Sequence, residues 1–308
     1  MSYIGIVGSG NVGANTAFFI AEKGIEDVRL YDIQEGTAKG KSLDIMEAAP
    51  VRRYRNKISG ADSLSDLKQA EMVVISAGTG RKPGQRPEDL FEINKDIIVQ
   101  LARDFKQLNS PGIFIIATEP VDMLTTVFVE ESGFVRERVI GLGGILDCTR
   151  LNYLVSRELG VSTENIACTV IGRHSNGMIF LPQYSCVSGI PLAQIMDHER
   201  IDAIISDIRE AGNLIVDMAQ RSSAYYAPSA ACAELVDSIH MNLRRLFCVS
   251  VFLQGEYGYE GVALSLPCII GKKGIEKVLA PELTSSQKHA FSISVEEIKS
   301  ILEKGAVK

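Results

Sequence analysis

Short apolar runs alternate with amphipathic stretches through the first half of the chain, which is typical of a parallel sheet with crossover helices. The runs that predict buried strands are Tyr3 to Val7, Val28 to Tyr31, Met72 to Ala77, Ile113 to Thr118 and Val139 to Leu142. Between the first two, Asn15 to Lys23 predicts a helix, which Gly24 ends. The expected fold class is α/β, with a Rossmann doubly wound parallel sheet.

The alternation stops near Gly143 and Gly144, where a second region begins. Its expected helices are Asp147 to Leu159, Ile201 to Arg221, Tyr226 to Leu246 and Val295 to Lys304. Its expected strands are Ile166 to Ile171 and an antiparallel pair, Phe247 to Leu253 and Val262 to Cys268. The 308 residues are therefore expected to form a Rossmann domain over residues 1–144 and an α+β domain with antiparallel strands over residues 145–308.

Glycines in the first strand-to-helix turn follow the spacing Gly8-x-Gly10-x-x-Gly13. The first allows a tight turn, the second lets the backbone approach a pyrophosphate, and the third lets the helix pack closely on the sheet. The helix N-terminus then faces the anion. The expected cofactor-binding residues of this turn are Gly8, Ser9, Gly10, Asn11, Val12 and Gly13.

Asp32 follows the next strand, at the place where the ribose of a bound dinucleotide lies. A carboxylate there accepts hydrogen bonds from ribose hydroxyls and repels a 2′-phosphate, so the expected cofactor is NAD rather than NADP. A glycine-rich turn alone is weak evidence, because many strand-to-helix turns match it. The flanking strand, helix and acid make the interpretation more specific.

The composition argues against some classes of partner and indicates the cellular compartment. The net charge of -6 and the pI near 5.4 argue against a nucleic-acid or anionic-membrane partner. No basic segment followed by an apolar run opens the chain, and no apolar stretch approaches the roughly 20 residues that span a bilayer, so neither a signal peptide nor a membrane span is expected. The 6 cysteines contain no Cys-x-x-Cys pair and are expected to be free thiols in a reducing cytoplasm. The 4 histidines are dispersed without zinc-binding spacing, so no metal is expected.

Ligands of open parallel sheets bind outside the carboxyl ends of the strands. Gly78, Thr118 and Glu119 follow two predicted strands and are therefore expected near the cofactor. The segment after Gly78 is too rich in Gly, Pro and charge to pack as core and is expected to be a mobile loop over the cleft. Its arginines, Arg81 and Arg86, fit an ordinary solvated loop and a functional role about equally.

Asp147 and Arg150 stand three residues apart on one predicted helix and therefore share a face. His174 follows a predicted strand. If the three meet at the cleft, Asp147 fixes the imidazole, His174 exchanges a proton with an alcohol, and Arg150 grips a carboxylate through two parallel bonds. Each also has an ordinary explanation: an acid near a helix N-terminus, a surface arginine and a core histidine.

Further motifs occur in a recognisable order: Gly40 to Ile45, Arg81 to Gly84, Pro120 to Asp122, Gly141 to Arg150, Gly172 to His174, Ala224 to Pro228 and Gln254 to Gly258. Together with the glycine turn and Asp32, they make the chain similar to the lactate/malate dehydrogenase family over nearly its whole length. The similarity is greatest to the malate dehydrogenases of that group.

The resemblance implies a proton relay of Asp147 and His174, with Arg150 on the substrate carboxylate and hydride exchange at C4 of the nicotinamide. It implies that the lid residue Arg81 meets a second carboxylate, which separates malate from lactate in this family. The matched cofactor-contacting positions are Asn94 and Thr118. The implied enzyme is an NAD-dependent, malate dehydrogenase-like homodimer or homotetramer of the tricarboxylic acid cycle, acting on a small 2-hydroxy or 2-oxo acid.

Three positions depart from the family pattern. Pro87 replaces the lid arginine that polarises the substrate carbonyl, and Arg86 stands one residue earlier, where an extended loop would point it the other way. Losing one such donor typically costs about 3 to 4 kcal/mol of transition-state stabilisation. Glu119 replaces an asparagine; unless it is protonated or paired with an arginine, it would repel a substrate carboxylate about 4 Å away by up to roughly 4 kcal/mol. Asn176 replaces an aspartate near the histidine.

These departures leave two main hypotheses. The first is a working NAD-dependent dehydrogenase of 2-hydroxy acids, because the residues retained are Arg81, Asp147, Arg150 and His174. The second is an NAD-binding paralogue with weak or no activity, or with an altered substrate, motivated by Pro87, Glu119 and Asn176. A short-chain dehydrogenase is a weaker third, because the chain contains no Tyr-x-x-x-Lys pair.

Overall fold

The structure is a computed structural model that describes residues 2–80, 87–219 and 224–306. The α-helices are α1 (Asn11–Lys23), α2 (Thr37–Arg52), α3 (Pro87–Gln107), α4 (Val121–Ser132), α5 (Gly144–Leu159), α6 (His198–Ala219), α7 (Tyr226–His240) and α8 (Ser285–Ala306). The strands are β1 (Ile4–Val7), β2 (Val28–Tyr31), β3 (Ile58–Gly60), β4 (Met72–Ile75), β5 (Ile113–Ile116), β6 (Val139–Gly141), β7 (Ile166–Ala167), β8 (Val170–Gly172), β9 (Met178–Phe180), β10 (Cys186–Val187), β11 (Ile190–Pro191), β12 (Arg245–Gln254), β13 (Glu260–Gly271) and β14 (Gly274–Val278).

One continuous sheet runs through both halves of the chain, in the order β3-β2-β1-β4-β5-β6-β12-β13-β8-β9, with β14 paired to β13. Strands β1 to β6 are parallel to their neighbours in the order 3-2-1-4-5-6, which is the Rossmann arrangement. Beyond β6 the pairing is antiparallel, and β11, β10 and β7 form a small separate sheet. The predicted fold class is confirmed.

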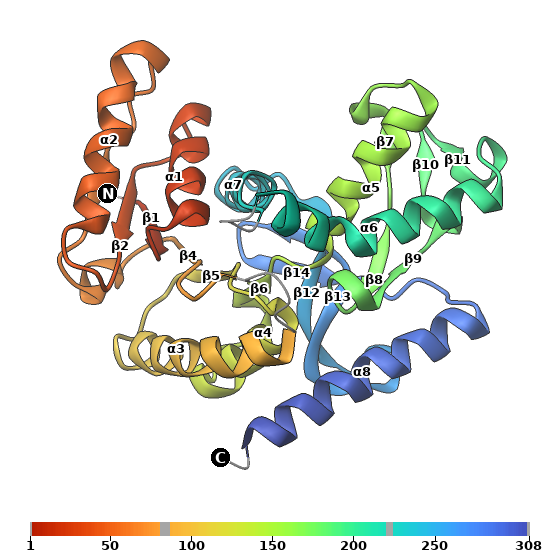
Figure 1. Cartoon of the computed structure of the whole chain (residues 1–308). Coiled ribbons are helices and arrows are strands. Elements are labelled where there is room, and N and C mark those ends of the chain that lie inside the picture. Colours follow the sequence, from red (N-terminus) through yellow and green to blue (C-terminus); the bar gives the residue numbers. More distant parts are fainter. Residues whose placement is uncertain (1, 81–86, 220–223, 307–308) are drawn as a thin grey trace.

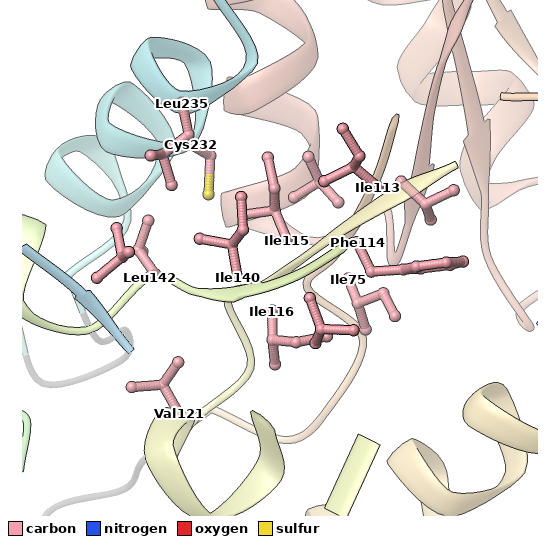
Figure 2. Packing of buried hydrophobic residues seen from close by; sticks show 14 of the residues in the cluster. Ile75, Ile113, Phe114, Ile115, Ile116, Val121, Ile140, Leu142, Cys232 and Leu235 are labelled. Atoms are coloured by element: carbon pink, nitrogen blue, oxygen red, sulfur yellow. The ribbon is translucent and has the colours of Figure 1, made fainter. Parts of the chain in front are cut away.

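Helices cover both faces of the parallel part, with α1 and α7 packed together on one face and α3 and α4 on the other (Figure 1). Figure 2 shows the core at β5 and β6, where Ile115 and Ile140 lie on the side that faces Cys232 of α7. On the opposite face, Phe114 stacks on Phe134. Successive β5 residues therefore alternate between two helical layers, as burial on both faces requires.

Several predicted boundaries were wrong, and the structure explains three of them. Helix α1 begins at Asn11 rather than Asn15, because the glycine turn is shorter than expected. The predicted strand Ile166 to Ile171 is two strands in different sheets, since side chains bond the backbone N–H groups between them: Asn152 accepts from Cys168 and Ser185 accepts from Thr169. The predicted helix Tyr226 to Leu246 ends at His240, because Asn242 and Arg244 take positive φ values.

Strand β2 has the predicted bounds, Val28 to Tyr31. The remaining predicted elements differ from the structure at their ends, with α6 and α8 beginning earlier than expected and β13 extending further. The predicted end of the α6 helix, Arg221, lies outside the described residues. The antiparallel pair β12 and β13 is confirmed. No helix in the described part of the chain combines the length and apolarity that crossing a membrane requires.

Candidate active site

The glycine turn joins β1 to α1 and leaves one side open. A Cβ atom at Gly13 would lie 1.9 Å from the Gly8 carbonyl oxygen, and one at Gly8, whose φ is +94°, would lie 2.6 Å from the Ala77 nitrogen. At Gly10, by contrast, a Cβ would meet nothing within 4 Å. Gly10 is also the N-cap of α1 and makes no side-chain capping bond, so the first N–H groups of the helix are available to an anion.

Asp32 lies directly beside this turn. One carboxylate oxygen accepts from the Ser9 N–H at 2.7 Å and the other from the Gln34 N–H at 3.0 Å. Ser9 is buried and Asn11 is exposed. The turn and the acid predicted from the sequence are thus held together by the protein's own backbone.

A cavity of about 210 Å³ opens where β4 and β5 end. Its lining includes the predicted site residues Val12, Gly78, Thr118, Glu119, Arg150 and His174. The Thr118 hydroxyl donates to the Ala77 carbonyl at 2.8 Å, which ties together the segments that follow the two strands. The cavity therefore lies at the carboxyl edge of the parallel strands, as expected for a ligand site.

Asp147 and His174 form a buried pair at this cavity. Asp147 lies in the first turn of α5 and only 1% of its side chain is exposed; its Oδ2 is 2.8 Å from His174 Nδ1. Arg150 lies one turn further along α5, with Nη1 3.9 Å from Asp147 Oδ1. The structure thus brings together the three residues that the sequence placed on one helix and after one strand.

Glu119 makes a contact that was not predicted: its Oε1 lies 3.3 Å from His174 Nε2. Its other oxygen accepts from the Val121 N–H at 3.2 Å. Desolvation raises the pKa of Glu119, but the charge and hydrogen bond of His174, with help from Arg150, lower it below its ordinary value. Glu119 is therefore ionised, and its direct partner among the described residues is the histidine rather than an arginine.

Charges around His174 set its protonation. Burial lowers the pKa of His174, yet Asp147 and Glu119 together hold it well above its ordinary value. Asp122, in the first turn of α4, accepts from the His174 backbone N–H at 2.7 Å, and burial raises the pKa of Asp122 to about 6. Asp122 received no role from the sequence, because its partner is a backbone N–H group of a distant segment.

Some predicted residues lie elsewhere. Asn94 is fully buried; its amide donates to the Glu119 carbonyl at 2.7 Å and bonds both backbone groups of Thr79, so it holds the pocket wall rather than lining the cavity. Arg81 and Arg86 lie outside the described residues. Pro87 begins helix α3, a position that favours proline, and so is not part of an extended loop.

The substituted motif after His174 forms a short 3-10 helix, Ser175–Gly177. Ser175 takes a φ of +66°, which is unusual for a residue with a side chain. Asn176 is exposed at the cavity. The loss of an aspartate here therefore removes a charge from the cavity rim.

Away from this cavity, Glu26, Glu71 and His240 bring possible metal-ligand atoms within 4.8 Å of one another, an approach that sequence spacing did not reveal. Glu71 already accepts from Ser2 at 2.8 Å and contacts His240 Nδ1 at 3.1 Å. Glu71 and His240 of this cluster therefore contact each other directly.

Comparisons with known proteins identify the family. Residues 2–141 match the lactate/malate dehydrogenase NAD binding domain, and residues 145–308 match the alpha/beta C-terminal domain of the same family. A malate dehydrogenase of Heliobacterium modesticaldum is 39% identical over 299 residues, covering 97% of each chain.

Solved structures show the same similarity. The malate dehydrogenase of Cryptosporidium parvum has a TM-score of 0.96 at 30% identity, covering 100% of this chain and 99% of that one. A lactate dehydrogenase of the same organism, in complex with lactic acid and nicotinamide adenine dinucleotide, has a TM-score of 0.95 at 28% identity, covering 99% and 98%. The chain belongs to the lactate/malate dehydrogenase family and is an NAD-dependent dehydrogenase.

Proposed function

We propose that the protein transfers hydride between NAD(H) and a small 2-hydroxy or 2-oxo acid, with malate and oxaloacetate as the substrate pair. The observation that carries this proposal is the buried Asp147–His174 pair, 2.8 Å apart, which shares its cavity with Arg150. A proton donor beside a carboxylate-binding cation is what reduction of a 2-oxo acid needs. The relatives named malate dehydrogenase support this substrate.

The residues present fit NAD. Gly10 leaves open space for a pyrophosphate, the N-terminus of α1 has no side-chain cap, and Asp32 lies beside the turn. The residues proposed to hold the cofactor are Gly8, Ser9, Gly10, Asn11, Val12, Gly13, Asp32, Gly78 and Thr118, with Asn94 supporting the wall behind them. When bound, the cofactor supplies or accepts the hydride at C4 of its nicotinamide.

His174, Asp147 and Arg150 have separate roles in the proposed reaction. In the reducing direction, His174 gives the proton on Nε2 to the carbonyl oxygen of the substrate. Asp147 accepts a hydrogen bond from Nδ1, which fixes the ring and stabilises its charged form. Arg150 binds the carboxylate next to the carbonyl. In the oxidising direction the neutral His174 removes the hydroxyl proton.

The lid is proposed to complete the site. Arg81 is assigned to the second carboxylate of the substrate, and Arg86 to the carbonyl oxygen in place of the arginine that Pro87 replaces. Substituting Arg86→Gln tests the second assignment, and an unchanged kcat would contradict it.

The decisive assay follows NADH oxidation at 340 nm with oxaloacetate, pyruvate and other small 2-oxo acids. We expect oxaloacetate to be reduced fastest. NADH oxidation no faster with any of these acids than without them would overturn the proposal.

The comparisons do not favour the alternative, a catalytically silent NAD-binding paralogue. That alternative predicts NAD binding without turnover, and recovery of activity in the double variant Pro87→Arg, Glu119→Asn. Ordinary dehydrogenase rates in the unmodified protein would exclude it.

We further propose a homodimer or homotetramer in the cytoplasm that serves the tricarboxylic acid cycle, with the domain boundary near residue 144. The 6 free cysteines support a reducing compartment. The two family matches, residues 2–141 and 145–308, support the boundary. Light scattering measures the oligomeric state, and a monomeric mass at micromolar concentration would contradict the assembly.

A further inference from the structure

Both ring nitrogens of His174 face a carboxylate. Nδ1 is 2.8 Å from Asp147, and Nε2 is 3.3 Å from Glu119. A neutral imidazole carries only one N–H group, so it donates to just one of these acids. Only the doubly protonated ring donates to both, and the geometry therefore favours the imidazolium form.

A side-chain amide and a backbone N–H group hold Glu119 in this position. Its carbonyl oxygen accepts from the buried Asn94, and its carboxylate accepts from the Val121 N–H at the start of α4, where a helix N-terminus favours negative charge. The side chain is 48% exposed and lines the cavity. It is thus anchored at one end and accessible to a ligand at the other.

The other charged groups near His174 lie on α4, on α5 and in the segment after β8. Asp122 of α4 accepts from its backbone N–H, and Arg150 of α5 lines the same cavity. The neighbouring Arg173 is directed towards Glu297 of α8, with Nη2 3.2 Å from Oε2. Within the described residues, Glu119 is the group on Nε2, the nitrogen that must reach the substrate oxygen in the proposed reaction.

We propose that Glu119 is a positioning residue that keeps the proton on His174 Nε2 in the free enzyme and is displaced from that nitrogen by the incoming 2-oxo acid. This inference rests on the proposed function. On reduction, the hydride adds to the carbonyl carbon and the Nε2 proton goes to the carbonyl oxygen, giving the hydroxy acid, the oxidised cofactor and neutral His174. After product release, His174 takes a proton from solvent and Glu119 returns to it.

By favouring protonated His174, this arrangement shifts the pH dependence of both directions to higher pH. The free enzyme enters reduction with its proton already in place. Oxidation needs neutral His174, whose population falls about tenfold for each pH unit below the midpoint of its titration. Oxidation is therefore expected to require a more alkaline pH than reduction.

The direct test is nitrogen-15 NMR of the histidine rings in the protein without cofactor, which reads protonation at each nitrogen. With only 4 histidines, each signal can be assigned by substitution. Glu119→Gln keeps the length of the side chain and an acceptor for Val121 while removing the charge. The His174 midpoint is expected to fall by about 1 pH unit in this variant, at the low end of the range for an adjacent opposite charge because Glu119 is half exposed. An unchanged midpoint would overturn the proposal.

Two further variants control this experiment. Glu297→Gln removes a carboxylate that contacts Arg173 rather than His174, and its His174 midpoint is expected to match the unmodified protein. Glu119→Asp restores the charge on a shorter side chain, and is expected to recover part of the shift. If Glu119→Asp behaves like Glu119→Gln in spite of a native circular dichroism spectrum, the charge is not what acts on the ring.

The second readout is kinetic. In Glu119→Gln, the acid limb of kcat/KM for hydroxy-acid oxidation is expected to move to lower pH by the same amount as the NMR midpoint, and KM for the oxo acid to fall. A changed KM with an unmoved pH profile would make Glu119 a wall of the pocket only and refute the inference. If no oxo acid turns over in any variant, the proposed function fails, while the NMR midpoints still decide the role of Glu119.

Discussion

Substituting glycines of the β1–α1 turn one at a time should separate folding from cofactor binding. In Gly13→Ala the new methyl group would lie 1.9 Å from the Gly8 carbonyl oxygen, well inside van der Waals contact, so α1 must move away from β1. Overpacking of this kind costs about 1 to 3 kcal/mol. At roughly 2 to 4 °C per kcal/mol, the melting temperature is expected to fall by several degrees. NADH binding should weaken as well, because the helix N-terminus is displaced.

Gly10→Ala is expected to behave in the opposite way. Gly10 has a φ of -70°, and its added methyl meets nothing within 4 Å, so the free protein should unfold at the same temperature or slightly higher. The methyl nevertheless stands where a pyrophosphate approaches the backbone. Losing one hydrogen bond to a charged group costs about 1.5 to 3 kcal/mol, which is a roughly 10- to 150-fold loss of NADH affinity.

Circular dichroism measures the melting temperature. Calorimetry or the fluorescence of NADH itself measures binding, since the chain has 0 tryptophans whose fluorescence could be followed instead. Gly40→Ala is the matched control: this exposed residue of α2 also has nothing within 4 Å of its added methyl, and NADH affinity should be unchanged. Wild-type NADH affinity in Gly10→Ala would refute the assignment of this turn to the pyrophosphate. A wild-type melting temperature in Gly13→Ala would refute the packing argument.

Three other outcomes are expected. Asp147→Asn should lower kcat by about 10²- to 10⁴-fold with little change in KM, because the buried partner of His174 Nδ1 loses its charge; a steady-state assay checks this, and a loss confined to KM would contradict it. For Asp122, the folded pKa of about 6 lies above the ordinary 3.8, so the contribution of this group to stability falls as the pH rises from about 4 to 6. Urea unfolding should therefore show the free energy of unfolding of Asp122→Asn rising relative to that of the unmodified protein, by about 3 kcal/mol across this pH range. A difference that does not change with pH would contradict the burial argument. Ser175→Gly should raise the free energy of unfolding by about 1 kcal/mol, because glycine adopts the φ of +66° without strain; no gain in urea unfolding would contradict this.

The parallel half of the fold could be predicted because its signals are local. Apolar runs and the glycine turn identified β1, β2, β4, β5 and β6, and α/β connections then restrict how they pair. The prediction of one strand over Ile166 to Ile171 was wrong because the signal for the break is not local. Its break depends on Asn152 and Ser185, whose side chains bond the intervening backbone from other elements, and an apolar pattern carries no record of such partners.

The site could be predicted only in part. The three-residue spacing of Asp147 and Arg150 placed both on one helix face, and the structure brings His174 to them. The partner of Glu119 could not be predicted, since it depends on the direction in which a side chain leaves the turn after β5. Asp122 was missed because its function is to accept a backbone N–H group, which leaves no spacing in the sequence.

Two of the departures from the family pattern, Asn176 and Glu119, change the negative charge near His174 in opposite directions. Asn176 removes a carboxylate from the motif after His174, while Glu119 adds one 3.3 Å from the same ring. Their positions differ in consequence, because Glu119 contacts Nε2, the nitrogen that reaches the substrate oxygen in the proposed reaction, whereas Asn176 is exposed at the rim. A silent paralogue would have no need to keep His174 between two carboxyl groups, with Asp147 buried behind it at the cost of desolvation. The substitutions therefore fit an active enzyme in which Glu119 influences the proton on His174 Nε2 better than a protein that has lost its activity.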